Sequence, residues 1–133
     1  MKKYIGFVAA ALFASNVAMA ELVANKSVVL FGDVALGQVA SDTIRVTNVG
    51  ANVIEGISVS ISGNSKEYDS SNCRSRLSSG ESCTINVTLT PLNYGTKRRK
   101  LTIDGVQFLV DGSTADVSLS IDLVGSSDNP NKP

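Results

Sequence analysis

The chain has 133 residues, 12 basic and 12 acidic, and contains no histidine and no tryptophan. The lack of histidine removes the commonest general base, the usual hydrolytic triads and the commonest transition-metal ligand. The lack of a basic excess argues against a protein dedicated to binding nucleic acid.

The first twenty residues have the pattern of a secretory signal peptide. Lys2 and Lys3 give a positive start, an apolar run follows over residues 4–14, and Ala18 and Ala20 supply small residues where a signal peptidase cleaves. The apolar run is shorter than the roughly 20 residues that span a bilayer. We expect cleavage after Ala20; the alternative is an uncleaved N-terminal anchor.

Residues 21–133 would then form the mature protein, in the periplasm or outside the cell. This length is typical of one domain, and no later stretch is apolar enough to cross a membrane. Loss of the two signal lysines leaves 10 basic and 12 acidic residues, so the mature chain is slightly acidic.

Short segments with alternating apolar and polar residues predict an all-β fold. The expected strands, in chain order, are 27–31, a short piece at 34–36, 43–47, 57–62, 84–90, 96–103, 106–110 and 117–123. Residues 65–82 are polar and are expected to form a loop. About seven short strands in roughly 100 residues are typical of an immunoglobulin-like antiparallel β-sandwich, which we assign to residues 21–125.

A turn and a tail are expected in the C-terminal third of the chain. Asp104-Gly105 is a strong signal for a two-residue hairpin turn. Residues 126–133 have nothing to bury and are predicted to form a disordered tail.

The two cysteines, Cys73 and Cys83, both lie in the exported part. In an oxidising compartment such a pair is most simply a structural disulfide. A redox-active pair is the alternative, but the spacing is not that of a CxxC motif and nothing nearby would lower a thiol pKa.

Lys97, Arg98, Arg99 and Lys100 form a basic run. Because neighbours on a strand face opposite ways, all four cannot face a dry core, so we expect an edge strand whose charges discourage unwanted pairing. The functional alternative is a patch for an acidic partner, either anionic lipid headgroups or an acidic protein.

The apolar segment 106–110, which contains Phe108, has two interpretations. It is either a core strand of a hairpin or an exposed edge that meets a partner by strand addition. The aspartates are scattered over turns and strands without the spacing of a calcium loop, so no metal site is predicted.

Three segments resemble the ASH/HYDIN group of immunoglobulin-like domains, relatives of the major sperm protein and of the first domain of pilus chaperones. They are 31–37 followed by 44–50, then 73–91, and 94–96 leading to 101–103. The second segment joins a cysteine, a leucine-containing loop, a glycine turn, a second cysteine, an alternating strand and a proline in the family's order. The chain departs from the family pattern after Ile103, where 106–110 intervenes before the last strand. The resemblance implies binding or scaffolding rather than a reaction; in bacteria such domains often occur in exported proteins, including those labelled choice-of-anchor D.

The sequence therefore favours a small exported binding or scaffold module, without catalytic residues or cofactor, that acts on a protein or cell-envelope partner. The principal alternative is a pilin-like or fimbrial subunit that assembles by strand exchange. An enzyme is the third class, but the serines have no recognisable arrangement with a base.

Overall fold

The computed structural model describes residues 21–63 and 66–131, so the predicted signal peptide and its cleavage site at Ala18 and Ala20 lie outside the described residues. Within these ranges the chain forms strands and no helix. The strands are β1 (Leu22–Ala24), β2 (Val28–Asp33), β3 (Ala40–Asn48), β4 (Ile54–Ile61), β5 (Tyr68–Ser70), β6 (Arg76–Leu77), β7 (Ser82–Leu89), β8 (Gly95–Phe108) and β9 (Thr114–Ser127). Consistent with this, no helix of the described part is long and apolar enough to cross a membrane.

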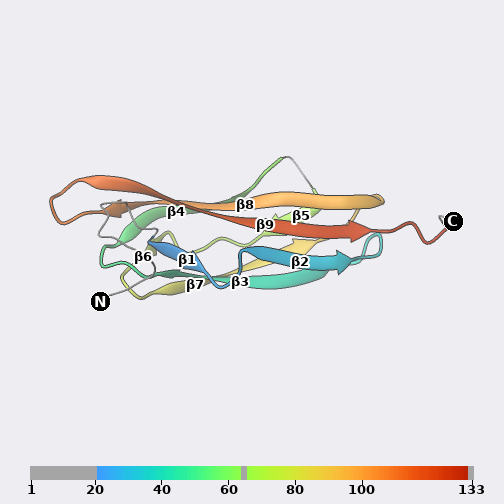
Figure 1. Ribbon diagram of the computed structural model, residues 1–133, viewed down its shortest axis with the longest axis horizontal. Coiled ribbons are helices and arrows are strands. Elements are labelled where there is room, and N and C mark those ends of the chain that lie inside the picture. The colour runs from blue at the N-terminus through green and yellow to red at the C-terminus, as the bar shows by residue number, and fades with distance from the viewer. Residues whose placement is uncertain (1–20, 64–65, 132–133) are drawn as a thin grey trace, which may run out of the picture.

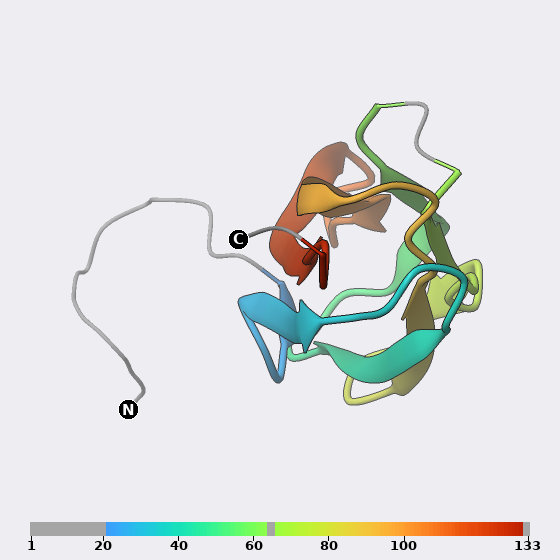
Figure 2. The same ribbon diagram turned by 90° about the vertical axis from the view of Figure 1, so that its right-hand side faces the viewer.

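The strands form two sheets that face each other (Figures 1 and 2). One has the order β1-β3-β7-β5, and the other has the order β2-β9-β8-β4-β6. The predicted all-β, immunoglobulin-like sandwich is confirmed. All strand pairs are antiparallel except β2 with β9, which run parallel.

The N-terminal segment crosses from one sheet to the other between β1 and β2. The Asn25 N–H still donates to the Arg45 carbonyl in the first sheet, and the Ser27 carbonyl already accepts from the Asp122 N–H in the second. This crossing leaves β2 as an edge strand beside only the second half of β9, because its register begins at Val28 opposite Asp122.

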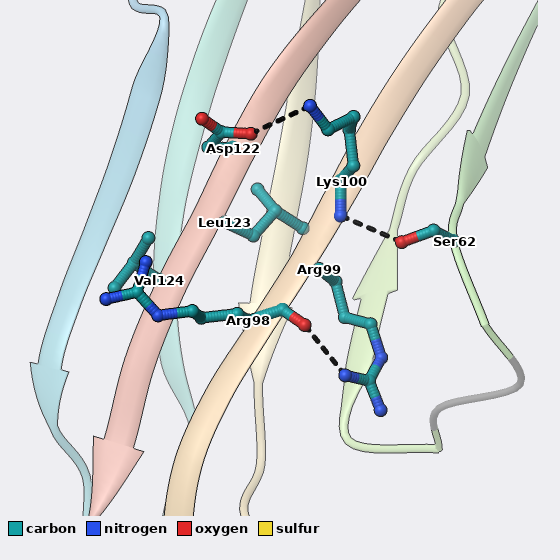
Figure 3. Close-up of a pocket in the computed structure, with 7 residues that line it drawn as sticks. All are labelled: Ser62, Arg98, Arg99, Lys100, Asp122, Leu123 and Val124. Carbon is teal, nitrogen blue, oxygen red and sulfur yellow. Dashed lines mark hydrogen bonds and ion pairs between the residues drawn. The ribbon is translucent and has the colours of Figure 1, made fainter.

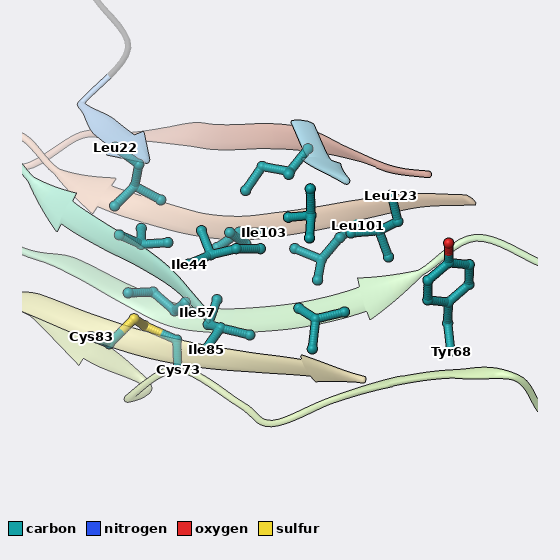
Figure 4. Close-up of a cluster of buried hydrophobic side chains, with 14 of the residues drawn as sticks. Leu22, Ile44, Ile57, Tyr68, Cys73, Cys83, Ile85, Leu101, Ile103 and Leu123 are labelled. Carbon is teal, nitrogen blue, oxygen red and sulfur yellow. A yellow bond between two sulfur atoms is a disulfide. The ribbon is translucent and has the colours of Figure 1, made fainter. Parts of the chain in front are cut away.

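The core lies between the sheets and is built from the inward-facing positions of the alternating strands (Figure 4). Ile44, Ile85, Ile103 and Leu123 have no exposed surface. Burial of one such side chain stabilises the fold by about 1.5–3 kcal/mol. The period-two pattern of the sequence therefore decides which face of each sheet is dry.

The predicted hairpin turn at Asp104-Gly105 is wrong, because both residues lie inside the single long strand β8. The glycine is needed for packing: a Cβ on Gly105 would come within 2.8 Å of Ile54 Cγ2 and 3.2 Å of Ile57 Cγ1. The actual reversal is at 109–113, where the Leu109 N–H donates to the Ser113 carbonyl and the Gly112 N–H to the Leu109 carbonyl. The segment 106–110 is thus the end of β8 and the start of this turn.

Three other expectations about element bounds need correction. Residues 34–36 form no strand, since β2 ends at Asp33 and the chain turns there. The stretch 65–82 is not all loop, because it holds β5 and β6, whose sparse side-chain alternation hid them. Strand β9 continues to Ser127, two residues into the predicted tail, because β8 pairs with it up to Gly95 opposite Ser127.

The predicted disulfide is present between Cys73 and Cys83, with a Cα–Cα distance of 5.5 Å. It fastens the loop before β6 to the beginning of β7, and both half-cystines are buried. At the same end of the sandwich the buried Asn48 side chain donates to the carbonyls of Asn52 at 2.8 Å and Leu77 at 2.9 Å, and it accepts from the Gly50 N–H at 3.0 Å.

Candidate functional site

Alternation along β8 splits the basic run between two faces of the sheet. Lys97 faces the other sheet and is buried, whereas Arg98 and Lys100 point to the outer face. Strand β8 as a whole is an interior strand between β9 and β4. However, β4 ends opposite Leu101, so within the described residues Lys97, Arg98 and Arg99 pair with β9 alone, and this part of the basic run lies at an edge of the sheet, as expected.

Lys97 belongs to a buried polar cluster rather than to an exposed patch. Its ammonium lies 2.9 Å from Glu67 Oε2 and 2.6 Å from Asn93 Oδ1, and the Lys97 and Glu67 side chains are 6% and 14% exposed. The Tyr68 hydroxyl donates to the Lys97 carbonyl at 2.9 Å. Such a cluster holds the β7–β8 loop and β5 against the start of β8, so its role is structural.

Two pKa shifts follow from this cluster. Burial would raise the pKa of Glu67, but hydrogen bonds from the Leu92 N–H and from Lys97 outweigh it and hold the pKa below its ordinary value. Burial raises the pKa of Tyr68 to about 12, although the nearby Arg99 cation opposes the shift.

The three other basic side chains border a shallow hollow of about 330 Å³ on the second sheet (Figure 3). Lys100 Nζ lies 3.4 Å from Asp122, and the Arg99 guanidinium donates to the Arg98 carbonyl at 2.7 Å. In the described ranges the guanidinium of Arg98 makes no ion pair, and it extends across β9 over Val124. The hollow is lined by Ser62, Arg98, Arg99, Lys100, Asp122, Leu123 and Val124.

The other end of the β8–β9 hairpin projects beyond the neighbouring strands as an arm (Figure 1). Phe108 closes β8 with 44% of its surface exposed, and Val110 in the turn is fully exposed. On the first half of β9, from Thr114 to Ser120, the side away from β8 has no paired strand in the described part, because the β2 register starts only at Asp122. The arm thus combines exposed apolar side chains with an open backbone edge.

The family comparison can be set against this geometry. The family model described as Cep192 domain 4 matches residues 19–128. The chain belongs to this family. It is thus an ASH, or PapD-like, immunoglobulin-like domain, and the resemblance drawn from the three sequence segments is confirmed.

Solved structures show the same fold at low sequence identity. The ASH/PapD-like domain 7 of human CEP192 matches with a TM-score of 0.69 and 11% identity, covering 95% of this chain and all of that one. The VesB protease of Vibrio cholerae matches with a TM-score of 0.60 and 19% identity, covering 78% of this chain and 32% of that one. The YadV chaperone matches with a TM-score of 0.59 and 15% identity, covering 85% and 55%.

The chain therefore spans about a third of the length of the VesB protease and about half that of the YadV chaperone. The comparison with functionally curated proteins gave no match. At these identities the solved structures establish the fold of the ASH domain, and the activity named for each relative remains a property of that relative.

The carboxylates that the structure describes lie apart from one another. Among the described residues no cluster of three or more Cys, Asp or Glu side chains is placed to hold an ion. Hydrogen bonds hold the pKa values of Asp42, Glu81 and Asp111 below their ordinary range, Asp42 through Lys26, Glu81 through the Ser78 N–H and Asp111 through Ser113. These carboxylates are stable anions on turns and strands.

Two pairs of side chains that the sheet brings to one surface could not be recognised from the sequence pattern. Val28 and Leu30 of the edge strand β2 are 39% and 73% exposed, and their register partners on β9 are Asp122 and Val124. Asp104 and Asp116 lie on the same outer face near the arm. The even-numbered residues of β8 all point to this face, so a single continuous strand would have indicated it. The turn predicted at Asp104 divided that strand in two.

Proposed function

We propose that the ASH domain is exported, loses residues 1–20, and acts in the periplasm or outside the cell as a non-enzymatic module that binds a protein or cell-envelope partner. Export is supported by the signal-like N-terminus, by the disulfide and by the likeness in fold to VesC, a secreted serine protease of Vibrio cholerae. A binding role is supported by the arm of β8 and β9.

The arm is the observation that carries this proposal. An open strand edge can add an extended peptide through main-chain hydrogen bonds, while side chains next to the edge supply specificity. Here the edge of β9 from Thr114 to Ser120 lies beside Val110, which is fully exposed. A partner that buried Val110 and paired with this edge would satisfy both features.

The first experiment is site-specific photo-crosslinking in native envelope fractions. A photoreactive amino acid replaces Val110, and a matched control carries it at Arg45, which is exposed on the outer face of the other sheet. We expect the Val110 probe, and not the Arg45 probe, to capture one dominant different protein, identified by mass spectrometry.

A variant tests whether Val110 itself is needed for capture. Val110→Asp should abolish capture by a second probe at Thr114 without changing the urea unfolding midpoint. A ladder of multimers of the chain itself at the Val110 probe would contradict the binding-module proposal and favour the fimbrial alternative. N-terminal sequencing of the exported protein should begin at Glu21.

A further inference from the structure

The outer face of the second sheet carries its charge unevenly along the strands. Near the start of β8 it has Arg98, together with Lys100 paired to Asp122; nearer the arm it has Asp104 and Asp116, together with Glu55 paired to Arg76. The first end therefore has a net positive charge and the second end a net negative charge. This difference gives the face a direction that a partner can recognise.

Between the charged ends the face is built from short hydroxyl side chains. These residues are Ser58, Ser60, Thr102, Ser118 and Ser120, which lie side by side on β4, β8 and β9. Short side chains let a second sheet approach to the roughly 10 Å spacing at which sheets pack face to face. The centre of the face can therefore be covered without displacing a bulky group.

We propose that this face binds a second copy of the chain and forms a closed dimer. The two-fold axis lies between the two faces, parallel to the sheets and perpendicular to the strands, and passes near Thr102 and Ser120. That rotation reverses the strand direction, so the basic end of each copy covers the acidic end of the other. A dimer of this kind goes beyond the proposed binding function, because it uses the outer face of β8 and β9 and leaves the backbone edge of β9 and the turn at Val110 accessible.

The register of the hairpin makes the charge match specific. Lys100 and Asp104 lie two residues on either side of Thr102, so the rotation sets Lys100 against the partner's Asp104. Arg98 then lies over the partner's Val106, whose register neighbour on β9 is Asp116, within reach of a long guanidinium side chain. The same two contacts are formed twice.

The free charges are available for these contacts. In the part of the chain that the structure describes, neither Arg98 nor Asp116 makes an intramolecular ion pair, and Asp104 accepts only a hydroxyl hydrogen bond from Ser118 at 2.8 Å. Lys100 is shared with Asp122 at 3.4 Å, with both side chains more than half exposed. A surface pair of this kind is weak and can rearrange.

The size of the face sets the expected affinity. From Arg98 to Val106 is about 26 Å along the strand, and four strands are about 19 Å wide, so each copy would bury about 500 Å². The two copies together would bury about 1,000 Å², which lies at the lower limit of specific interfaces and corresponds to a weak dimer that forms at high protein concentration.

The test is a charge exchange followed by analytical ultracentrifugation of the exported protein at low salt. We expect the wild type to reach twice its monomer mass as concentration rises and to return to monomer in high salt, which screens the pairs. Arg98→Glu combined with Lys100→Glu, and Asp104→Lys combined with Asp116→Lys, should each stay monomeric because like charges then face each other. An equal mixture of the two variants should recover the dimer as a heterodimer.

Controls separate this contact from other causes. The single changes Arg98→Glu and Asp116→Lys repeat the exchange without disturbing the Lys100–Asp122 pair, and urea midpoints check that each variant is folded. Arg45→Glu, on the other sheet, should dimerise like the wild type. The proposal would be overturned by a wild type that stays monomeric at every concentration, by a charge variant that dimerises alone, or by a mixture of the two variants that stays monomeric. Neither result bears on partner capture through Val110.

Discussion

The two ends of the sandwich are closed by different chemistry. At one end the Cys73–Cys83 disulfide and the buried Asn48 amide hold the loops. At the other end Lys97 forms a buried ion pair with Glu67, and its backbone carbonyl accepts a hydrogen bond from the Tyr68 hydroxyl. Figure 4 shows the disulfide and Tyr68 at these two ends. The register of β7 shows that these are opposite ends, because Cys83 pairs with Val46 and Leu89 pairs with both Ala40 and Tyr68. The disulfide end depends on redox state, and the Lys97 end depends on pH.

The two ends hold loops that cannot be buried in the core, and they do so by different means. A covalent bond limits the unfolded chain, whereas a buried ion pair stabilises only while both charges are present. The two ends should therefore fail under different conditions. Removing the contacts at one end should leave the other end intact.

The largest effect is expected from Lys97→Met. The substitution keeps the length of the stem but leaves the Glu67 carboxylate, 14% exposed, without its cation. Breaking one partner of a buried pair costs about 3–5 kcal/mol of unfolding free energy, measured by urea denaturation at pH 7. The double variant Lys97→Met with Glu67→Gln should recover most of this loss, since the amide oxygen can still accept from the Leu92 N–H.

The same pair sets the acid limit of the wild type. Because the folded-state pKa of Glu67 lies below its ordinary value of 4.5, its contribution is complete above that value and is lost as pH falls through the folded-state pKa. The double variant should lack this acid phase. An unchanged acid profile in the double variant would mean that another carboxylate controls the transition.

The second effect belongs to the disulfide end. Replacing Cys73 and Cys83 by serine, or adding a reductant to the wild type, should lower the unfolding free energy by about 3 kcal/mol, the loop-closure value for residues ten apart in sequence. The acid profile should keep its shape, because Lys97 and Glu67 are at the far end. A reductant that abolished the acid phase would show that the two ends unfold as one coupled network.

The strands of the core could be predicted from sequence, but the fastenings at the ends could be predicted only in part. Strand β7 alternates cleanly, so its buried face at Ile85, Val87 and Leu89 followed from a period of two. The disulfide followed from two cysteines in a chain that the sequence predicts to be exported. Lys97 could not be separated from Arg98 by residue type, since its burial depends on tertiary contacts with Glu67, next to β5, and with Asn93 of the β7–β8 loop.

The error at Asp104-Gly105 has the same origin. A local turn signal competed with a tertiary requirement, and the tertiary requirement prevailed, because Gly105 makes room for Ile54 and Ile57 across the sheet. No pattern within five residues records the position of β4. The uneven charge of the outer face could not be predicted for the same reason, since Arg98 and Asp104 share that face only because β8 is one continuous strand.

A smaller loss is expected from Asn48→Ala at the disulfide end. The side chain has no exposed surface, and its three hydrogen bonds connect the turn after β3 to the carbonyls of Asn52 and Leu77. The substitution leaves the carbonyls of Asn52 and Leu77 without this donor, so we expect the unfolding free energy, measured by urea denaturation, to fall by about 2 kcal/mol. Asn86→Ala, at an exposed position of β7, is the matched control and should change stability by less than about 0.5 kcal/mol.

The smallest effect is expected from Tyr68→Phe at the Lys97 end. The change removes one buried hydrogen bond, from the Tyr68 hydroxyl to the Lys97 carbonyl, at a cost of about 1 kcal/mol near neutral pH. Burial raises the folded-state pKa of Tyr68 from 10.0 to about 12, so the hydroxyl stabilises the fold fully below pH 10 and this contribution is lost as pH rises toward 12. The phenylalanine variant should therefore be less stable than the wild type at pH 8 and should lose less stability between pH 10 and 12. Tyr94→Phe, at a ring that is 44% exposed, should leave both values unchanged, and an alkaline phase that persists in Tyr68→Phe would assign it to another group.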